Sequence, residues 1–414
     1  RRTAPNSRAL RWHRRSPAKL AKTHPKLAKL TERVILPSKR IQFRRVPRLA
    51  EITTEPGGTR LQCCGDSAAI WEVLNTKKNP SVGCVITKNN SIISIGFTSI
   101  NGRPHAEQNA INLSKTNLKN SELYVTLEPC SHYGKTSPCT KSIIKNGIKK
   151  VFFSINDPDL RSYNKSTKLL RRKKISVNKG TYANELNLFY RSYIKSKRNL
   201  LPFVTCKLSV SKDFFTINKK NKWITNKFSR ARVHLMRSNH DCIITSSKTI
   251  IKDNSELTCR IDGLKNRSPS RIILDNKLKI SLNSKIIKEA SIYRTIIFYN
   301  KSNKKKIKRL KNLNVKSFKI SLDVEKNLDL GEALIKVRQL GFYRIFLETG
   351  MKLATNFLHK NLVDDLKLFI SNKNLGRNGM CNIKKNLKLI LKDKESINEK
   401  VNLFGDKLIT YKIN

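Results

Sequence analysis

The stretch PHAEQNAINLSKTNLKNSELYVTLEPCSHYGKTSPC, residues 104–139, decides the fold of the region around it and contains a candidate metal site. His105, Cys130 and Cys139 offer one imidazole and two thiolates, the nitrogen and sulfur ligands that Zn²⁺ prefers. Three protein ligands leave a fourth tetrahedral position open for water, which is typical of a catalytic zinc site. Glu107 lies close behind the histidine and can carry a proton between such a water and a leaving amine. The pattern therefore predicts hydrolytic deamination.

The residues around these side chains have the spacing of a helix, a strand and a second helix. Small and apolar residues recur with helical spacing over residues 106–113, so His105 and Glu107 would lie at the N-terminus of that helix. Residues 121–129 are typical of a buried strand that a proline ends. A second helix is expected to begin near Pro138, because proline is favoured in a first turn. Two helix N-termini would thus surround the site, where the helix dipoles favour thiolates.

The order His-x-Glu and then Pro-Cys resembles the signature of the zinc nucleobase deaminases, which continues as Pro-Cys-x-x-Cys. Here the longer insert SHYGKTSP separates Cys130 from Cys139. This insert resembles the bifunctional riboflavin-biosynthesis deaminase-reductases, and it argues against the short-spaced branches that act on cytidine or on tRNA adenosine. The stretch NPSVGCVI, residues 79–86, resembles the opening strand of the same family, and the resemblance continues to the C-terminus.

The resemblance implies an α/β protein in which an N-terminal cytidine-deaminase-like zinc domain is followed by a dihydrofolate-reductase-like domain. We expect these domains at residues 63–197 and 198–414. Strands expected in the first domain would form a mixed sheet with the two helices; they lie at residues 81–87, 91–97, 122–128 and 150–155. In the family, the stretch at residues 156–175 closes the active site. Residues 183–197 have helical spacing.

A glycine turn carries the physical case for a cofactor in the second domain. Residues 343–358 read as strand, turn and helix, and Gly350 would let the helix present free backbone N–H groups to a phosphate. In the family this segment binds NADPH. The resemblance further implies that NADPH contacts Ser209, Trp223, Thr249, Asp253, Asn276 and Gly350. It implies that the phosphorylated pyrimidine substrate contacts Asn79, Asn221, Arg237, Leu257, Arg260 and Glu348.

Some positions leave alternatives open. Trp223 is equally well explained by core packing, and His132 either touches substrate phosphate or is a solvated loop histidine. The family has a Gly-Gly pair where this chain has Thr349 before Gly350, and Lys212 also departs from the usual apolar residue. Branching at a turn that approaches a phosphate can clash. A deaminase whose second domain no longer reduces anything is therefore a first alternative.

The composition is strongly basic, with 86 Lys and Arg against 29 Asp and Glu and a formal net charge of +57. Such a charge suggests nucleic acid, and a deaminase acting on RNA is a second alternative. A basic protein in which zinc only holds the fold is a third. However, the lysines are spread along the whole chain without a basic and aromatic face, so we interpret them as a solvated surface. We expect small anionic substrates, a homo-oligomer and no nucleic-acid partner.

The cysteines and apolar runs indicate the compartment. The nine cysteines have no disulfide-framework spacing, which predicts a reducing environment. We expect four of them to lie in the core, namely Cys84, Cys206, Cys242 and Cys259. No apolar run approaches the ~18 residues that a membrane span needs. These features predict a cytoplasmic enzyme.

Residues 1–62 differ from the rest of the chain. The first fifty residues contain sixteen Lys or Arg and a single acidic residue, Glu32. We expect residues 1–62 to be a basic leader that is disordered or not native; a transit peptide, and hence a plastid location, is the alternative. The family has a helix just before the NPSVG strand, and residues 66–78 occupy that place here.

Overall fold

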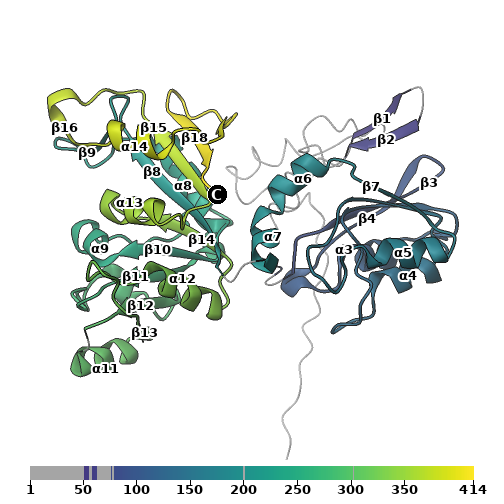
Figure 1. Ribbon diagram of the computed structural model, residues 1–414, viewed down its shortest axis with the longest axis horizontal. Helices are drawn as coiled ribbons and strands as arrows, with labels where there is room; N and C mark the ends of the chain where they lie inside the picture. Colours follow the sequence, from purple (N-terminus) through teal and green to yellow (C-terminus); the bar gives the residue numbers. More distant parts are fainter. Residues whose placement is uncertain (1–50, 56–57, 63–75, 77–78, 199–200, 302) are drawn as a thin grey trace, which may run out of the picture. The chain divides into compact units, whose positions relative to one another are not determined.

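The computed structural model describes residues 51–55, 58–62, 76, 79–198, 201–301 and 303–414. Its two larger sheets belong to two α/β regions, which follow one another along the chain (Figure 1). No helix among the described residues is long and apolar enough to cross a membrane.

A short antiparallel hairpin lies inside the segment that we expected to be disordered. Strand β1 (Glu51–Glu55) pairs with β2 (Gly58–Gln62). β-branched residues such as Ile52, Thr53 and Thr54 favour a strand at this position. Residues 56–57, between the two strands, lie outside the described residues. The rest of the leader, residues 1–50, lies outside the described residues, as does almost all of the helix expected at 66–78.

The first region is built on a five-stranded mixed sheet. Its strands are β3 (Gly83–Lys88), β4 (Ser91–Phe97), β5 (Glu122–Leu127), β6 (Lys150–Ile155) and β7 (Ser176–Lys179), in the order β4-β3-β5-β6-β7. Strand β3 is antiparallel to both of its neighbours, whereas β5, β6 and β7 are parallel. The four expected strands and the mixed sheet are confirmed, while β7 was not expected.

Helices cover this sheet and define where the metal site lies. They are α3 (Ala106–Leu113), α4 (Cys139–Lys145), α5 (Lys165–Arg172), α6 (Ala183–Phe189) and α7 (Arg191–Arg198), with the 3-10 turn η2 (Ile100–Gly102) before α3. Helix α3 packs against β3 and β4, α4 against α3, and α5 against α4 (Figure 1). A Cβ on Gly96 would overlap the backbone of Ala106 and Ala110, so glycine permits the close approach of α3 to β4.

The second region contains a nine-stranded sheet that is mostly parallel. Its strands are β8 (Phe203–Val210), β10 (Cys242–Ser246), β11 (Ser270–Leu274), β12 (Thr295–Tyr299), β13 (Val315–Lys319), β14 (Arg344–Glu348), β15 (Asp365–Ile370), β17 (Ser396–Asn398) and β18 (Lys407–Lys412). The order is β13-β12-β11-β10-β14-β8-β15-β18-β17. The strands from β13 to β15 in this order are parallel, and β18 and β17 add an antiparallel edge.

Hydrophobic residues fill both faces of this sheet. Cys242 and Ile244 belong to one buried cluster and Ile243 to the other, because successive strand residues point to opposite faces. The covering helices are α8 (Lys227–Ser238), α9 (Ser247–Asp253), α10 (Lys285–Lys288), α11 (Lys304–Asn312), α12 (Leu330–Gln339), α13 (Met351–His359) and α14 (Lys384–Ile390). The remaining elements are the ribbon of β9 (Phe215–Asn218) with β16 (Gly379–Asn382) and the 3-10 turns η3 (Lys265–Arg267) and η4 (Gly376–Asn378).

The cysteines expected in the core are buried. Cys84, Cys206, Cys242 and Cys259 are each almost fully removed from solvent. Burial raises the pKa of the Cys206 thiol to about 12 and that of Cys242 also upward, so both are un-ionised at neutral pH. These thiols therefore act as small apolar residues.

Candidate functional site

The three expected metal ligands come together at the starts of two helices. His105 precedes the first residue of α3, Cys130 lies in the loop after β5, and Cys139 is the first residue of α4. Their ligand atoms all lie within 4.8 Å of one another. His105 Nδ1 is 3.5 Å from Cys130 Sγ and 3.4 Å from Cys139 Sγ. The convergence of one nitrogen and two sulfur atoms fits a zinc site with an open fourth position.

The local charges support metal binding at this cluster. The bond with Cys139 is the largest of the effects that lower the pKa of Cys130 to about 4, whereas the same bond and burial raise the pKa of Cys139. The backbone N–H of Cys139 also donates to Cys130 Sγ, at 3.3 Å. Burial works against the His105 imidazolium, but its contact with Cys130 and the charge of Glu107 raise the pKa of His105. A bound divalent cation would favour the thiolate form of both cysteines.

Glu107 lies in the first turn of α3, and its side chain is buried. Burial raises the pKa of Glu107 to about 7, and the negative charge of Cys130 adds to the rise. A carboxyl group that gains and loses a proton near neutral pH is suited to general acid and base catalysis. The expected pairing of a zinc cluster with a proton carrier is thus present in the geometry.

A second buried carboxylate organises the loop beside the cluster. Glu128 follows β5, and its carboxylate accepts hydrogen bonds from Ser166 Oγ at 2.7 Å and from the backbone N–H groups of Asn164 and Asp157 at 3.1 and 3.3 Å. These bonds fix residues 157–166, which are part of the stretch of residues 156–175 that the family resemblance places over the active site. The sequence analysis missed Glu128, because a single carboxylate before a proline has no distinctive spacing.

Two further polar residues of the first region are tied into its loops. His132 Nδ1 lies 2.9 Å from Ser162 Oγ, so His132 is held against the loop of residues 156–166 instead of being a freely solvated histidine. Asn79 Nδ2 donates to the carbonyl oxygen of Gly102 at 2.6 Å. Asn79 is thereby fixed to the turn that precedes His105.

In the second region, several expected cofactor residues follow the carboxyl ends of neighbouring parallel strands. Thr249 follows β10, Asn276 follows β11, and Gly350 follows β14. Because parallel strands end at the same edge of a sheet, these residues share one edge, where ligands bind in open α/β sheets. A Cβ on Gly350 would lie 4.0 Å from Thr249 Oγ1, so the two residues are neighbours.

Gly350 leaves open space at the start of α13. Its φ of −70° does not require glycine, and a Cβ would meet nothing closer than Thr249. The free backbone N–H groups of this helix start suit a phosphate. Next to it, the hydroxyl of Thr349 is buried and has no hydrogen-bond partner among the described residues. An unsatisfied buried hydroxyl calls for a ligand or water partner.

Arg237 and Glu348, both expected to hold substrate, are paired with each other. Arg237 Nε donates to Glu348 Oε2 at 2.9 Å and Nη2 donates to Oε1 at 2.8 Å. Burial opposes the Glu348 carboxylate, but Arg237 outweighs it and lowers the pKa of Glu348. Lys207, the neighbour of Glu348 on β8, lowers this pKa further. The sequence analysis missed Lys207, although Thr205, Lys207 and Ser209 recur with the period of a strand.

Leu257 and Arg260 lie in an irregular segment near this pair. Leu257 is buried and has a positive φ of 57°. Arg260 is exposed at 52% of its side chain, and its Nη1 lies 3.4 Å from Glu256 Oε2. The carbonyl oxygen of Thr258, between them, accepts a hydrogen bond from Arg237 Nη1 at 2.9 Å. Arg237 therefore links Glu348 to the segment that contains Leu257 and Arg260.

The other expected residues are placed less specifically. Trp223 is 55% exposed, with the Arg230 guanidinium 4.8 Å from its ring centre, so its interpretation as a core residue was wrong. Asn221 is exposed beside it, and among the described residues neither has a polar or ring contact with Arg237 or Glu348. Asp253 ends α9 and is exposed, and Ser209 lies on β8.

Comparisons with known proteins identify a matching family for each of the two regions. Residues 66–155 match the family described as cytidine and deoxycytidylate deaminase zinc-binding region, and residues 202–403 match the RibD C-terminal domain. The riboflavin biosynthesis protein RibD of Aquifex aeolicus is 33% identical over 80% of this chain and 92% of its own length. That of Bacillus amyloliquefaciens is 32% identical over 72% of this chain and 79% of its own length.

Solved structures agree with the sequence matches. A deaminase/reductase from Thermotoga maritima, whose activities are named as diaminohydroxyphosphoribosylaminopyrimidine deaminase and 5-amino-6-(5-phosphoribosylamino)uracil reductase, superposes with a TM-score of 0.70 at 29% identity. The match covers 83% of this chain and 96% of that one. RibD of Acinetobacter baumannii also gives a TM-score of 0.70, at 25% identity, over 83% of this chain and 95% of that one.

Proposed function

Because this chain belongs to the family of riboflavin biosynthesis proteins RibD, which are bifunctional deaminase-reductases, we propose how its own residues perform the two reactions. The first reaction is the hydrolytic deamination of 2,5-diamino-6-ribosylamino-4(3H)-pyrimidinone 5′-phosphate. The second is the NADPH-dependent reduction of the ribosyl chain of the deaminated product to a ribityl chain. We assign the first reaction to a domain at residues 63–197 and the second to a domain at residues 198–414.

The deaminase site consists of a metal cluster and a buried carboxyl group. His105, Cys130 and Cys139 would hold a zinc ion, which activates water for attack on the amine-bearing carbon. Glu107 takes up a proton from the attacking water and gives it to the departing nitrogen, which leaves as ammonia. Its pKa of about 7 suits both roles. Asn79, whose side chain is hydrogen-bonded to the turn before His105, contacts the substrate.

The reductase site lies at the carboxyl edge of the second sheet. NADPH would supply the hydride there. Its phosphates would lie at the start of α13, where Gly350 leaves the backbone N–H groups open. The other residues that we assign to NADPH are Ser209, Trp223, Thr249, Asp253 and Asn276.

The substrate of the reductase carries a phosphate and a sugar chain. We assign Arg260 to the phosphate, because its side chain is half exposed and its ion pair with Glu256 is long. Arg237 fixes Glu348, and Glu348 contacts the hydroxyl groups of the sugar chain. Asn221 and Leu257 complete the substrate contacts that we propose. The basic surface of the chain suits such small anionic substrates, and we propose no nucleic-acid partner.

The single observation that carries this proposal is the convergence of His105, Cys130 and Cys139 beside the buried Glu107. The test is to load the full chain with zinc, add the phosphorylated pyrimidine and follow ammonia release. We expect one equivalent of zinc and a rate that depends on it. Bound zinc without ammonia release would reject this substrate.

A degenerate reductase is the second candidate function, and it is favoured by Thr349 at the glycine turn. The observation against it is that Gly350 and the start of α13 leave open space. Titration of the full chain with NADPH decides between the two. Stoichiometric binding removes the degenerate alternative, and absence of binding establishes it.

A further inference from the structure

The irregular segment of residues 254–260 follows helix α9 and contains Leu257 and Arg260, which the proposed function assigns to the reductase substrate. No backbone ladder of a helix or sheet fixes these residues. Leu257 has a positive φ of 57°, which is uncommon for a bulky residue and persists only when surrounding contacts hold it. The side chains that hold this segment therefore decide where Arg260 and Leu257 lie.

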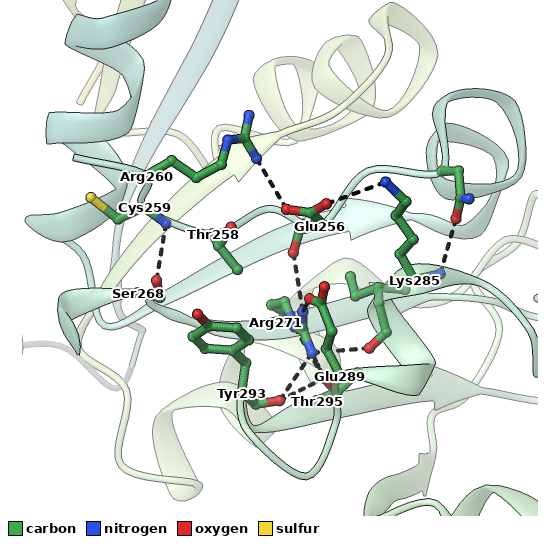
Figure 2. Close-up of polar contacts among 12 residues, drawn as sticks. Glu256, Thr258, Cys259, Arg260, Ser268, Arg271, Lys285, Glu289, Tyr293 and Thr295 are labelled. Carbon is green, nitrogen blue, oxygen red and sulfur yellow. Dashed lines mark hydrogen bonds and ion pairs between the residues drawn. The ribbon is translucent and has the colours of Figure 1, made fainter. Parts of the chain in front are cut away.

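The side chain that makes the most hydrogen bonds next to this segment is that of Arg271 on strand β11 (Figure 2). It is fully buried. Arg271 Nη1 donates to the carbonyl oxygen of Glu256 at 3.1 Å and to Glu289 Oε2 at 3.2 Å. Its other donors are directed to Thr295 Oγ1 and to the carbonyl oxygens of Ile286 and Tyr293. The guanidinium group is planar, and several acceptors bind its donors. These bonds therefore hold the side chain in one position and also compensate its charge.

The burial of Arg271 needs an explanation beyond packing. A buried charge is unfavourable unless it is paired and hydrogen-bonded. Burial lowers the pKa of Arg271, and the ion pair with Glu289 works in the opposite direction. Most of its hydrogen bonds go to α10 and to the residues between α10 and the start of β12, but the one to Glu256 reaches the segment of residues 254–260. Arg271 thus connects a rigid strand to that segment.

The side chain of Glu256 extends the connection to Arg260. Its carboxylate lies 3.4 Å from Arg260 Nη1 and 3.4 Å from Lys285 Nζ (Figure 2). Both ion pairs are long and partly exposed, so each is weak. They orient Arg260 without binding it tightly, so a phosphate can displace Glu256 and take bidentate bonds.

The far end of the segment is held by separate contacts. Arg237 Nη1 donates to the carbonyl oxygen of Thr258. Ser268 Oγ accepts from the backbone N–H of Cys259 at 3.0 Å (Figure 2). Leu257 lies between the Arg271 contact and the Arg237 contact. Removing Arg271 would take away the buried hydrogen bond at the Glu256 end, where the exposed bond from the backbone N–H of Lys285 to Asn254 Oδ1 and the long ion pairs of Glu256 remain.

We propose that Arg271 is a positioning residue of the reductase: through the backbone of Glu256 it places Leu257 and Arg260 for the phosphorylated substrate. This inference rests on the proposed function, which supplies the role of those two residues. Arg271 itself is fully buried and touches neither substrate nor cofactor.

The test compares Arg271→Lys and Arg271→Met with Arg344→Lys in the full chain. Lysine keeps the charge but loses the fork, and methionine keeps the bulk without charge. Arg344 is a suitable control, because it is a largely buried arginine of the same sheet and its ion pair is with Asp241. The measurements are the KM for the reductase substrate, the KM for NADPH, ammonia release and the thermal midpoint.

We expect Arg271→Lys to raise the KM for the phosphorylated substrate at least tenfold, with the KM for NADPH and ammonia release within twofold of wild type. Arg344→Lys should lower the thermal midpoint without this change in KM. In an Arg260→Ala background, Arg271→Lys should raise the KM by clearly less than in the wild-type background, because the part of its effect that acts through Arg260 is already lost. An unchanged KM in Arg271→Lys, or full additivity with Arg260→Ala, would overturn the inference.

Hydrogen exchange provides a measurement that does not depend on turnover. Both Arg271 variants should exchange the amides of residues 254–260 at least tenfold faster than Arg344→Lys, and the methionine variant most of all. If wild-type protein fails to oxidise NADPH, the proposed reductase function fails, and exchange alone decides whether Arg271 holds the segment. Equal exchange in all variants would refute the role of Arg271 whether or not the reductase works.

Discussion

Replacing Glu107 by glutamine tests whether the zinc cluster is catalytic or structural. Glutamine has nearly the same shape as glutamate but cannot accept the proton of the attacking water. A positioned general acid and base contributes typically ~10²–10⁴-fold to a rate, which is about 3–5 kcal/mol of barrier. Glu107 is the acidic residue in the first turn of α3, next to the ligand His105. We therefore expect Glu107→Gln to lower kcat for ammonia release by roughly 10³-fold.

The fold should survive this change. Burial raises the pKa of Glu107 to about 7, which means that the folded protein disfavours the carboxylate at neutral pH. A neutral glutamine avoids that penalty, so the thermal midpoint should not fall. NADPH oxidation with the deaminated pyrimidine as substrate should also remain at the wild-type rate, because that reaction belongs to the second domain.

Glu128→Gln is the matched control, since Glu128 is another buried glutamate near the cluster. Its carboxylate accepts three hydrogen bonds that hold residues 157–166. In Glu128→Gln, an amide nitrogen would replace one carboxylate oxygen and would point at hydrogen-bond donors. This should lower the free energy of unfolding by about 1–3 kcal/mol. Ammonia release by folded Glu128→Gln should fall far less than in Glu107→Gln. A loss smaller than tenfold in Glu107→Gln with full zinc content would refute a catalytic role for Glu107.

Three further predictions concern other parts of the protein. Chelation of zinc should stop ammonia release and leave NADPH oxidation of the deaminated substrate intact; loss of both would mean that the metal holds the whole fold. Thr349→Val removes a buried hydroxyl without a partner and should stabilise the cofactor-free protein by about 1 kcal/mol, as measured by denaturant unfolding. It should also weaken NADPH binding in a titration if that hydroxyl meets the cofactor, and unchanged affinity would show that it does not. Burial lowers the pKa of His240 to about 4. Between pH ~4 and the unfolded-state pKa of ~6.5, the unfolded chain binds more protons at this histidine than the folded chain does. The neutral, buried His240 therefore contributes up to about 3 kcal/mol to the free energy of unfolding above pH ~6.5, and this contribution is lost as the pH falls towards ~4. His240→Gln should reduce the slope of the free energy of unfolding against pH in this range. A slope equal to that of the wild type would contradict a lowered pKa of His240 in the folded protein.

The local part of the site was predictable because its signals are local. His105, Glu107 and Cys139 all lie at helix starts, and helix starts can be read from apolar spacing and proline. The strands of the first sheet follow from alternation of apolar residues. Strand β7 was missed because SVNK is short and polar, so it joins the sheet through backbone pairing with β6.

The residues of the second candidate site were proposed from the family resemblance, and their mutual geometry could not be predicted. Arg237 and Glu348 are 111 positions apart, and nothing in the sequence shows that they bind each other before any substrate arrives. Arg271 illustrates the same limit. It stands at the start of an apolar strand, and only the folded chain shows its acceptors in the loops around Glu256 and Glu289.

Trp223 shows how the structure decides between two readings of one residue. Core packing and cofactor contact fitted the sequence equally well, because tryptophan is common in both. Its side chain is 55% exposed and stacks with Arg230, so the core reading fails on burial.

The most direct test of the account follows ammonia release and NADPH oxidation separately in one reaction of the zinc-loaded chain with the phosphorylated diaminopyrimidine and NADPH. We predict that ammonia appears first, that NADPH oxidation follows after a lag, and that the two reach equal final amounts. The lag should vanish when the deaminated pyrimidine is supplied. Ammonia release with no oxidation of NADPH from either substrate would contradict the claim that this chain performs both reactions.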